Sequence, residues 1–152
     1  MTARADGGRG VRVAGKKRIL FVDDELDMRM FISTVLRSEG YEAVPARNAV
    51  EGIQKARELK PDLVIMDVMM PQAGGVTLFQ AMRRDEGLKR TPLIMLSGVS
   101  PKAFAHHLKM LDAVDGAPLA PPEAYLEKPL DPARLVQTIR GLLHEDLPTA
   151  AF

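Results

Sequence analysis

Asp67 closes an uninterrupted run of four apolar residues at positions 63–66, shortly after Pro61. Such a run is typical of a strand that is buried on both faces of a parallel sheet, with the carboxylate at its carboxyl end. Open parallel sheets bind their ligands at that end. A single Asp can also bond to the backbone of its own loop, so Asp67 alone leaves a structural and a functional interpretation open.

Three further apolar runs end in polar side chains that could act together with Asp67. These are the acid pair Asp23 and Asp24, the hydroxyl of Ser97 and the cation Lys128. Taken singly, each has an ordinary explanation, because acids often neutralise helix N-termini, Ser is common in turns and Lys is common on surfaces. Their shared position at the ends of apolar runs favours one common site.

Apolar runs alternate with apolar stripes at helical spacing, and this predicts alternating strands and helices. The strands are expected at residues 19–22, 41–46, 63–67, 92–97 and 124–128, and the helices at about 28–39, 49–59, 76–85, 100–111 and 132–143. Residues 71–75 and 112–123 are expected to be loops. In the second helix we expect Val50 and Ile53 to face the core.

Several helix ends carry recognisable capping residues. Gly40 is expected to end the first helix, and Asn48 with Glu51 three residues later predicts a capping box for the second. Proline follows both Ser100 and Asp131, which is the pattern of an N-cap with proline at the first helical position.

Five strands alternating with five helices predict an α/β fold. Its architecture is a five-stranded parallel sheet with helices on both faces, a doubly wound, flavodoxin-like (βα)5 fold with right-handed crossovers. Because parallel strands end at the same edge, the polar strand ends converge there. They are Asp23, Asp24, Asp67, Ser97 and Lys128.

The composition, 46% hydrophobic and 27% charged residues in 152, fits one soluble globular domain. No apolar run is long enough to cross a membrane, so we expect a cytoplasmic protein without a membrane partner. The absence of Cys excludes disulfides and thiol catalysis. We divide the chain into a leader at 1–16, a domain at 17–143 and a tail at 144–152.

Residues 1–18 carry six cations and one anion, so the remainder of the chain is mildly acidic. Cations attract nucleic-acid phosphates regardless of sequence. The leader has no aromatic residue and no periodicity, however, and this favours a solvated, disordered basic segment. We therefore expect no nucleic-acid partner for this chain.

Three converging carboxylates repel one another, and without a cation at least one of them should keep its proton above the normal pH range. Mg²⁺ prefers oxygen ligands and suits sites of carboxylates with a phosphoryl oxygen. The formal charges of three Asp, Lys128 and Mg²⁺ cancel, so the site could accept a phosphoryl dianion. Carboxylates are covalent phosphate acceptors, and this suggests phosphoryl transfer onto Asp67.

Over about residues 17–143 the chain resembles the receiver domain of two-component response regulators. It is similar to the chemotaxis regulators, in which such a domain stands alone. The resemblance is carried by Phe21-Val22-Asp23-Asp24, by Asp67 with Met70-Pro71 and Gly75, by Ser97-Gly98 and by Lys128-Pro129. What it implies is a protein that accepts a phosphoryl group from a histidine kinase or phosphotransfer protein and changes its partner-binding face. It implies no enzyme beyond catalysis of its own phosphorylation and dephosphorylation.

The resemblance also implies a role for each matching residue of the phosphorylation site. Asp67 is implied to be the phosphoacceptor. Asp23 and Asp24 are implied to hold Mg²⁺, directly or through water, together with Asp67 and the backbone carbonyl of Met69. Lys128 is implied to bind the phosphoryl group.

The switch that the resemblance implies begins at Ser97. Its hydroxyl moves toward phosphorylated Asp67, and Tyr125, the coupled aromatic residue, turns inward into the vacated space. The peptide bond between Lys128 and Pro129 is similarly expected to be cis.

Two features depart from the family pattern. The stretch from Ser97 to Lys128 is longer than in compact members, with the surplus in the loop at 112–123. Met69 is apolar where the family often has a polar residue that orients hydrolytic water, and we therefore expect a long-lived acyl phosphate.

Other functions stay open at this stage. A receiver-like interaction module that signals without phosphorylation is the main alternative. A haloacid-dehalogenase-like phosphatase would need a second Asp at Met69, and a flavodoxin-like nucleotide binder would need a Gly-rich turn after the first strand. No output domain follows the last predicted helix, which leaves a stand-alone regulator and a fragment of a larger one both possible.

Overall fold

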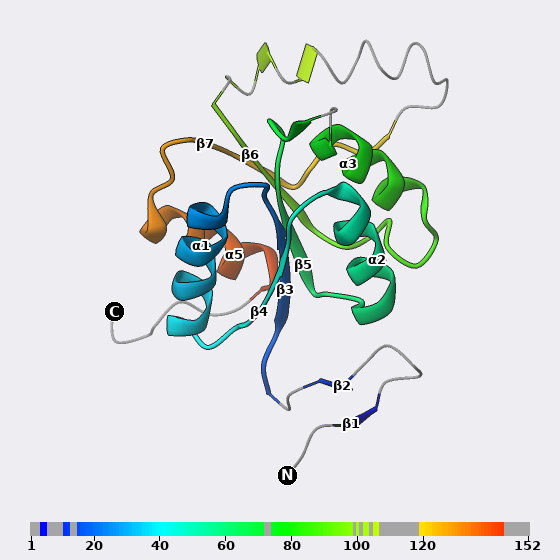
Figure 1. The fold of residues 1–152 in the computed structure, drawn as a ribbon, viewed down its shortest axis with the longest axis vertical. Coiled ribbons are helices and arrows are strands. Elements are labelled where there is room, and N and C mark those ends of the chain that lie inside the picture. The colour runs from blue at the N-terminus through cyan, green and yellow to red at the C-terminus, as the bar shows by residue number, and fades with distance from the viewer. Residues whose placement is uncertain are drawn as a thin grey trace.

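The structure is a computed structural model of the chain, and it describes residues 4–5, 11–12, 15–71, 74–98, 100, 102–103, 105–106 and 119–144. Its centre is a five-stranded parallel sheet in the order β4-β3-β5-β6-β7 (Figure 1). The strands are β3 (Arg18–Val22), β4 (Glu42–Ala46), β5 (Leu63–Asp67), β6 (Leu93–Ser97) and β7 (Ala124–Glu127). The predicted fold class is confirmed.

The strand order reverses between β3 and β5. From β3 the chain moves outward to β4, and it then returns to the other side of β3 to add β5, β6 and β7 in turn. In open parallel sheets the crossovers leave in opposite directions at such a point, which opens a crevice at the carboxyl ends of the two strands. The residues that end β3 and β5 therefore lie at the natural ligand site of this fold.

Helices cover both faces of the sheet, with α1 and α5 on one side and α2 and α3 on the other (Figure 1). Their bounds are α1 (Leu26–Ser38), α2 (Ala49–Leu59), α3 (Gly74–Arg84) and α5 (Pro132–Leu142). The three inner strands, β3, β5 and β6, are buried along their whole length because both faces are covered, whereas the edge strands β4 and β7 are mostly half-buried. Two hydrophobic cores result, one on each face.

The predicted N-caps form, but the capping box is only half complete, because Glu51 Oε1 accepts from the Arg47 N–H at 2.6 Å and not from that of Asn48. Asn48 accepts a hydrogen bond from the Glu51 N–H at 2.8 Å, and Asp131 accepts one from Ala133 at 3.0 Å. Gly40 follows α1 with a φ of 87°, in the left-handed region that glycine adopts without strain. Of the predicted helix at 100–111, residues 102–103 and 105–106 are helical, and most of the remainder lies outside the described residues.

Two details of the predicted helices are wrong. Val50 is 77% exposed, because α2 approaches the sheet through Gly52 and Ala56, whereas Ile53 is half-buried against the core as predicted. A Cβ on Gly52 would lie 2.9 Å from Val22 Cγ2, which shows how close the helix comes. Residues 74–75, expected in a loop, are the first two residues of α3.

The basic leader contributes two short strands. β1 (Arg4–Ala5) and β2 (Val11–Arg12) pair in antiparallel fashion, in a sheet separate from the main one. Arg18, which the charge count grouped with the leader, is a core residue at the start of β3, where its Nε contacts Glu42 at 3.1 Å. Among the described helices, none has the length and apolarity needed to cross a membrane.

Candidate functional site

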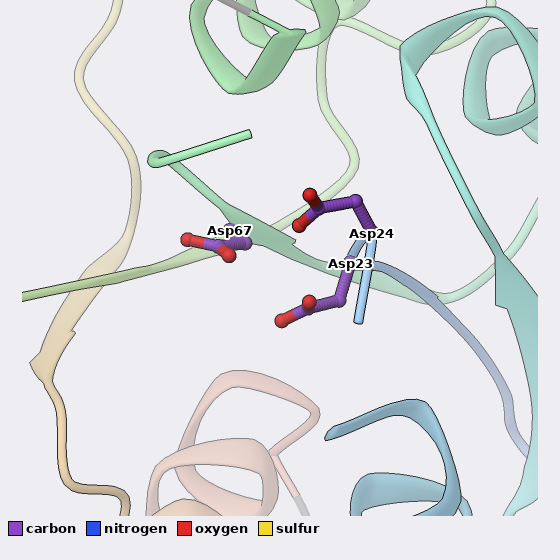
Figure 2. Close-up of side chains that lie close together, drawn as sticks. All are labelled: Asp23, Asp24 and Asp67. Carbon is purple, nitrogen blue, oxygen red and sulfur yellow. The ribbon is translucent and has the colours of Figure 1, made fainter. Parts of the chain in front are cut away.

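Three carboxylates meet at the carboxyl ends of β3 and β5. Asp23 and Asp24 follow β3 directly, and Asp67 is the last residue of β5. One oxygen from each lies within 4.8 Å of the other two. Figure 2 shows the three side chains extending in the same direction from the two strand ends. Asp23 and Asp67 are buried whereas Asp24 is exposed, so the cluster opens to solvent on the side of Asp24.

Asp23 is held by three hydrogen bonds. Its N–H donates to the Ala46 carbonyl at 3.1 Å, its carbonyl accepts from Arg29 Nη1 at 2.8 Å, and its Oδ1 accepts from the Glu25 N–H at 2.9 Å. The other carboxylate oxygen, Oδ2, is buried and has no hydrogen-bond partner in the described part of the chain. An unpaired buried carboxylate oxygen is costly unless a cation or a proton satisfies it.

The pKa of Asp23 is raised to about 6 from 3.8. Burial is the largest cause, and the charges of Asp67 and Asp24 add to it. The backbone hydrogen bond from Glu25 and the charge of Lys128 act in the opposite direction. The expected proton-holding carboxylate is therefore Asp23, and desolvation contributes more to this shift than the repulsion on which the expectation was based.

Lys128 brings a cation to the same carboxylates. Its Nζ lies 3.1 Å from Asp67 Oδ2 and 3.8 Å from Asp23 Oδ2. Burial alone would lower the pKa of Lys128, but the hydrogen bond and charge of Asp67, with smaller effects of Asp23 and Glu25, raise it. Lys128 therefore keeps its positive charge. Its peptide bond to Pro129 is cis, as expected.

Asp67 uses both of its carboxylate oxygens. Oδ2 accepts from Lys128, and Oδ1 accepts from the backbone N–H of Met69 at 2.9 Å. Met69 itself is 59% exposed. Hydrogen bonds to both oxygens thus fix the orientation of the Asp67 carboxylate, while the acid cluster remains open to solvent on the side of Asp24.

Gly75 supports the turn that follows Asp67. A Cβ at this position would lie 2.3 Å from the Asp67 carbonyl oxygen and 2.6 Å from Val68 Cα, so α3 can begin against this backbone only without a side chain. The glycine therefore fixes the distance between the start of α3 and the end of β5.

Ser97 and Tyr125 form a polar pair on the neighbouring strands. Ser97 ends β6 and is fully buried, and its carbonyl accepts from the Lys128 N–H at 2.9 Å. Its side chain is hydrogen-bonded to that of half-buried Tyr125, whose pKa is raised chiefly by burial. A continuous path of contacts thus connects Asp67 through Lys128 and Ser97 to Tyr125.

The donor set suits a hard divalent cation. Two buried carboxylates and an exposed one offer oxygen ligands only, which is the preference of Mg²⁺. The unpaired Oδ2 of Asp23 and the raised pKa of the same group are both relieved by a bound cation. A hollow of about 350 Å³, lined in part by Asp24, Arg47 and Thr77, adjoins the cluster.

The structure brings together all of the predicted strand-end residues, but two arginines that organise them were not predicted. Arg29 binds the backbone of Asp23, and Arg83 binds the segment before β7. Both act largely on backbone carbonyls, which carry no signature in the sequence. Arg29 falls outside the apolar stripe of α1, and Arg83 looks like an ordinary basic residue in the last turn of α3.

The chain is similar in sequence to known proteins. The family model described as response regulator receiver domain matches residues 19–140, which include every residue of the site. The polar-differentiation response regulator DivK of Brucella anthropi is 29% identical over 128 residues, covering 84% of this chain and 96% of DivK.

Solved structures agree with this match. The chemotaxis response regulator CheY4 of Vibrio cholerae is 29% identical with a TM-score of 0.70, covering 84% of this chain and 98% of that one. The receiver domain of a signal transduction histidine kinase from Syntrophus aciditrophicus is 25% identical with a TM-score of 0.71, covering 90% and 99%. The chain belongs to the response regulator receiver domain family, the signalling switches of two-component systems.

Proposed function

We propose that this chain is a Mg²⁺-dependent phosphoacceptor switch and that Asp67 receives the phosphoryl group. The observation that carries the proposal is the acid cluster of Asp23, Asp24 and Asp67 with Lys128 Nζ 3.1 Å from the Asp67 carboxylate. Membership of the receiver family supports it. The physiological donor is a histidine kinase or a phosphotransfer protein, and the chain catalyses only its own phosphorylation and dephosphorylation.

The transfer exchanges one phosphorus bond for another. A carboxylate oxygen of Asp67 attacks the phosphorus, and the bond from phosphorus to the donor breaks. The electron pair of that bond leaves with the donor, on the nitrogen of a phosphohistidine or on the carboxylate of an acyl phosphate. Because the transferring group is loosely bonded at the transition state, catalysis consists mainly of positioning and charge neutralisation.

The residues around Asp67 supply both the positioning and the charge neutralisation. Lys128 already contacts the Asp67 carboxylate and is free to bind a phosphoryl oxygen once the carboxylate is phosphorylated. Asp23, Asp24, Asp67 and the Met69 carbonyl would hold Mg²⁺. When bound, the ion neutralises the carboxylates and the incoming phosphoryl oxygens.

The signal passes from the phosphoryl group to the surface through Ser97 and Tyr125. These side chains are hydrogen-bonded to each other, so a Ser97 hydroxyl that turns to a phosphoryl oxygen must change its contact with Tyr125. Tyr125 is half-buried on β7, the edge strand of the sheet. Phosphorylation thereby biases the position of an aromatic side chain that a protein partner can detect.

The test is intact-mass analysis after incubation with acetyl phosphate, with and without Mg²⁺. We expect the wild type to gain one phosphoryl group only with Mg²⁺, and Asp67→Asn to gain none. Asp27→Asn, which removes an exposed acid of the first turn of α1 outside the cluster, is the matched control and should be phosphorylated like the wild type.

Two results would contradict the proposal. Phosphorylation of Asp67→Asn would place the acceptor elsewhere. No phosphorylation of the wild type, either by acetyl phosphate or by a panel of purified histidine kinases, would favour a receiver-like module that signals through binding alone.

A further inference from the structure

Arg29 is the fourth residue of α1, and its guanidinium reaches back to the end of β3. Nη1 donates to the Asp23 carbonyl at 2.8 Å, and the backbone N–H of Arg29 donates to the Glu25 carbonyl at 3.1 Å. The side chain is half-buried. Arg29 therefore ties the first turns of α1 to the segment that carries the acid pair.

The contact with Arg29 completes the fixation of Asp23. Of the four polar atoms of Asp23, the N–H is bonded to Ala46, the carbonyl oxygen to Arg29 and Oδ1 to Glu25. Only Oδ2 is left without a hydrogen bond among the described residues, and it lies in the acid cluster, 3.8 Å from Lys128 Nζ. The three bonds thus orient the residue so that its fourth polar atom is available to a ligand.

Arg29 makes the only one of these three contacts that depends on a donor side chain. The bonds to Ala46 and Glu25 use backbone groups, which any sequence would supply at those positions. Without Arg29 the Asp23 carbonyl would be hydrated. The turn between β3 and α1 would also lose the hydrogen bond that fixes the orientation of the Asp23 backbone. Groups that hold a metal ligand in place change metal affinity about 10- to 100-fold when they are removed.

We infer that Arg29 is a positioning residue for the metal site, acting through the backbone of Asp23. The inference rests on the proposed function, because it requires Mg²⁺ to bind at the cluster of Asp23, Asp24 and Asp67. Arg29 itself donates to a carbonyl and touches neither the ion nor the phosphoryl group.

The charge of Arg29 makes the inference testable. The guanidinium of Arg29 is bonded to the backbone of Asp23. A cation near a metal site repels Mg²⁺, so removal of its charge would by itself tighten Mg²⁺ binding. Loss of positioning has the opposite effect, because Asp23 no longer presents Oδ2 in a fixed orientation. The direction of the change in affinity therefore separates the two roles.

The experiment is isothermal titration calorimetry of the full chain with Mg²⁺ at constant ionic strength. Arg29→Met keeps the length of the apolar stem and removes the donor, and Arg29→Gln keeps a polar group that falls short of the carbonyl. Arg37→Met is the matched control, since it removes an exposed cation from the last turn of the same helix. Thermal melting in EDTA reports whether each variant folds.

We expect Arg29→Met to raise the Kd for Mg²⁺ about tenfold and Arg37→Met to leave it within about twofold. Arg29→Lys, which keeps a cationic donor, should give an intermediate Kd. An Arg29→Met Kd equal to or below that of the wild type would overturn the inference, whether or not the melting temperature falls. If Arg29→Met does not fold, Arg29→Gln carries the same expectation. A wild type that binds no Mg²⁺ would overturn the proposed function as well, which distinguishes the two failures.

Discussion

At the scale of single residues, position at a strand end makes most of the site predictable. Asp23, Asp67 and Ser97 each end or follow an apolar run, and parallel strands end at the same edge. The contacts of Asp23 with Arg29 and of Asp67 with the Met69 N–H could not be predicted in this way. They depend on the path of the backbone after the strand, which the side-chain pattern does not specify.

Met69 is the residue whose type should set the lifetime of the phosphorylated state. Its side chain is 59% exposed and lies two residues after Asp67, but a thioether cannot hold a water by strong hydrogen bonds. We expect Met69→Asn to shorten the half-life of phosphorylated Asp67 by roughly tenfold, less than a full general base provides, because an amide only orients the water.

The measurement is the decay of the phosphorylated mass after the donor is removed. Met69→Leu is the control, since it replaces one apolar side chain by another, and its decay rate should equal that of the wild type. If the Asn variant decays no faster than the Leu variant, Met69 does not limit hydrolysis.

At the scale of elements, strand and helix order follows from periodicity, but the face that a helix turns to the sheet does not. The stripe of α2 predicted that Val50 is buried, whereas the helix packs through Gly52 and Ala56. Small residues allow a close approach, and their packing is not visible in a count of apolar side chains. Gly75 is part of the family resemblance, but the apolar pattern did not predict that the backbone of α3 meets that of β5 at this residue.

Arg83 fixes the segment that leads into β7. Its buried guanidinium makes five hydrogen bonds that connect α3 with the loop before β6 and with the residues before β7. The acceptors are the carbonyls of Lys89, Thr91, Ala120 and Pro121 and the carboxylate of Glu123. The cation also lies 5.5 Å from the centre of the Phe79 ring. The long stretch between Ser97 and Lys128 is therefore anchored at its end.

Removal of this anchor should destabilise the whole domain. We expect Arg83→Met to lower the free energy of unfolding by about 3 kcal/mol, because it removes the buried donor of five hydrogen bonds, four to backbone carbonyls and one to the Glu123 carboxylate. Urea denaturation followed by circular dichroism measures the change. Arg90→Met removes an exposed arginine from the adjacent loop and should change the stability by less than about 0.5 kcal/mol. Equal midpoints for the two variants would show that the anchor is dispensable.

At the scale of the whole molecule, the acid cluster links folding stability to pH and to Mg²⁺. The pKa of Asp23 is about 6 in the fold against an ordinary value of 3.8, so between these pH values the folded state binds more protons than the unfolded state. Stability then falls as the pH rises through this window. Above pH 6, when no cation is bound, ionised Asp23 lowers the free energy of unfolding by its full amount, about 3 kcal/mol for two pKa units.

The variant Asp23→Asn isolates this effect because it does not titrate. In EDTA, the difference in unfolding free energy between Asp23→Asn and the wild type should shift in favour of the variant by about 2 to 3 kcal/mol between pH 4 and pH 7. Constant effects of the substitution cancel, because only the change with pH is compared. Mg²⁺ at 100 times its Kd should then stabilise the wild type by about 2.7 kcal/mol at pH 7 and leave Asp23→Asn nearly unchanged. If the difference in unfolding free energy between the variant and the wild type does not vary with pH, Asp23 is ionised in the fold at no cost. The burial of its Oδ2 would then not be the reason why the cluster requires a cation.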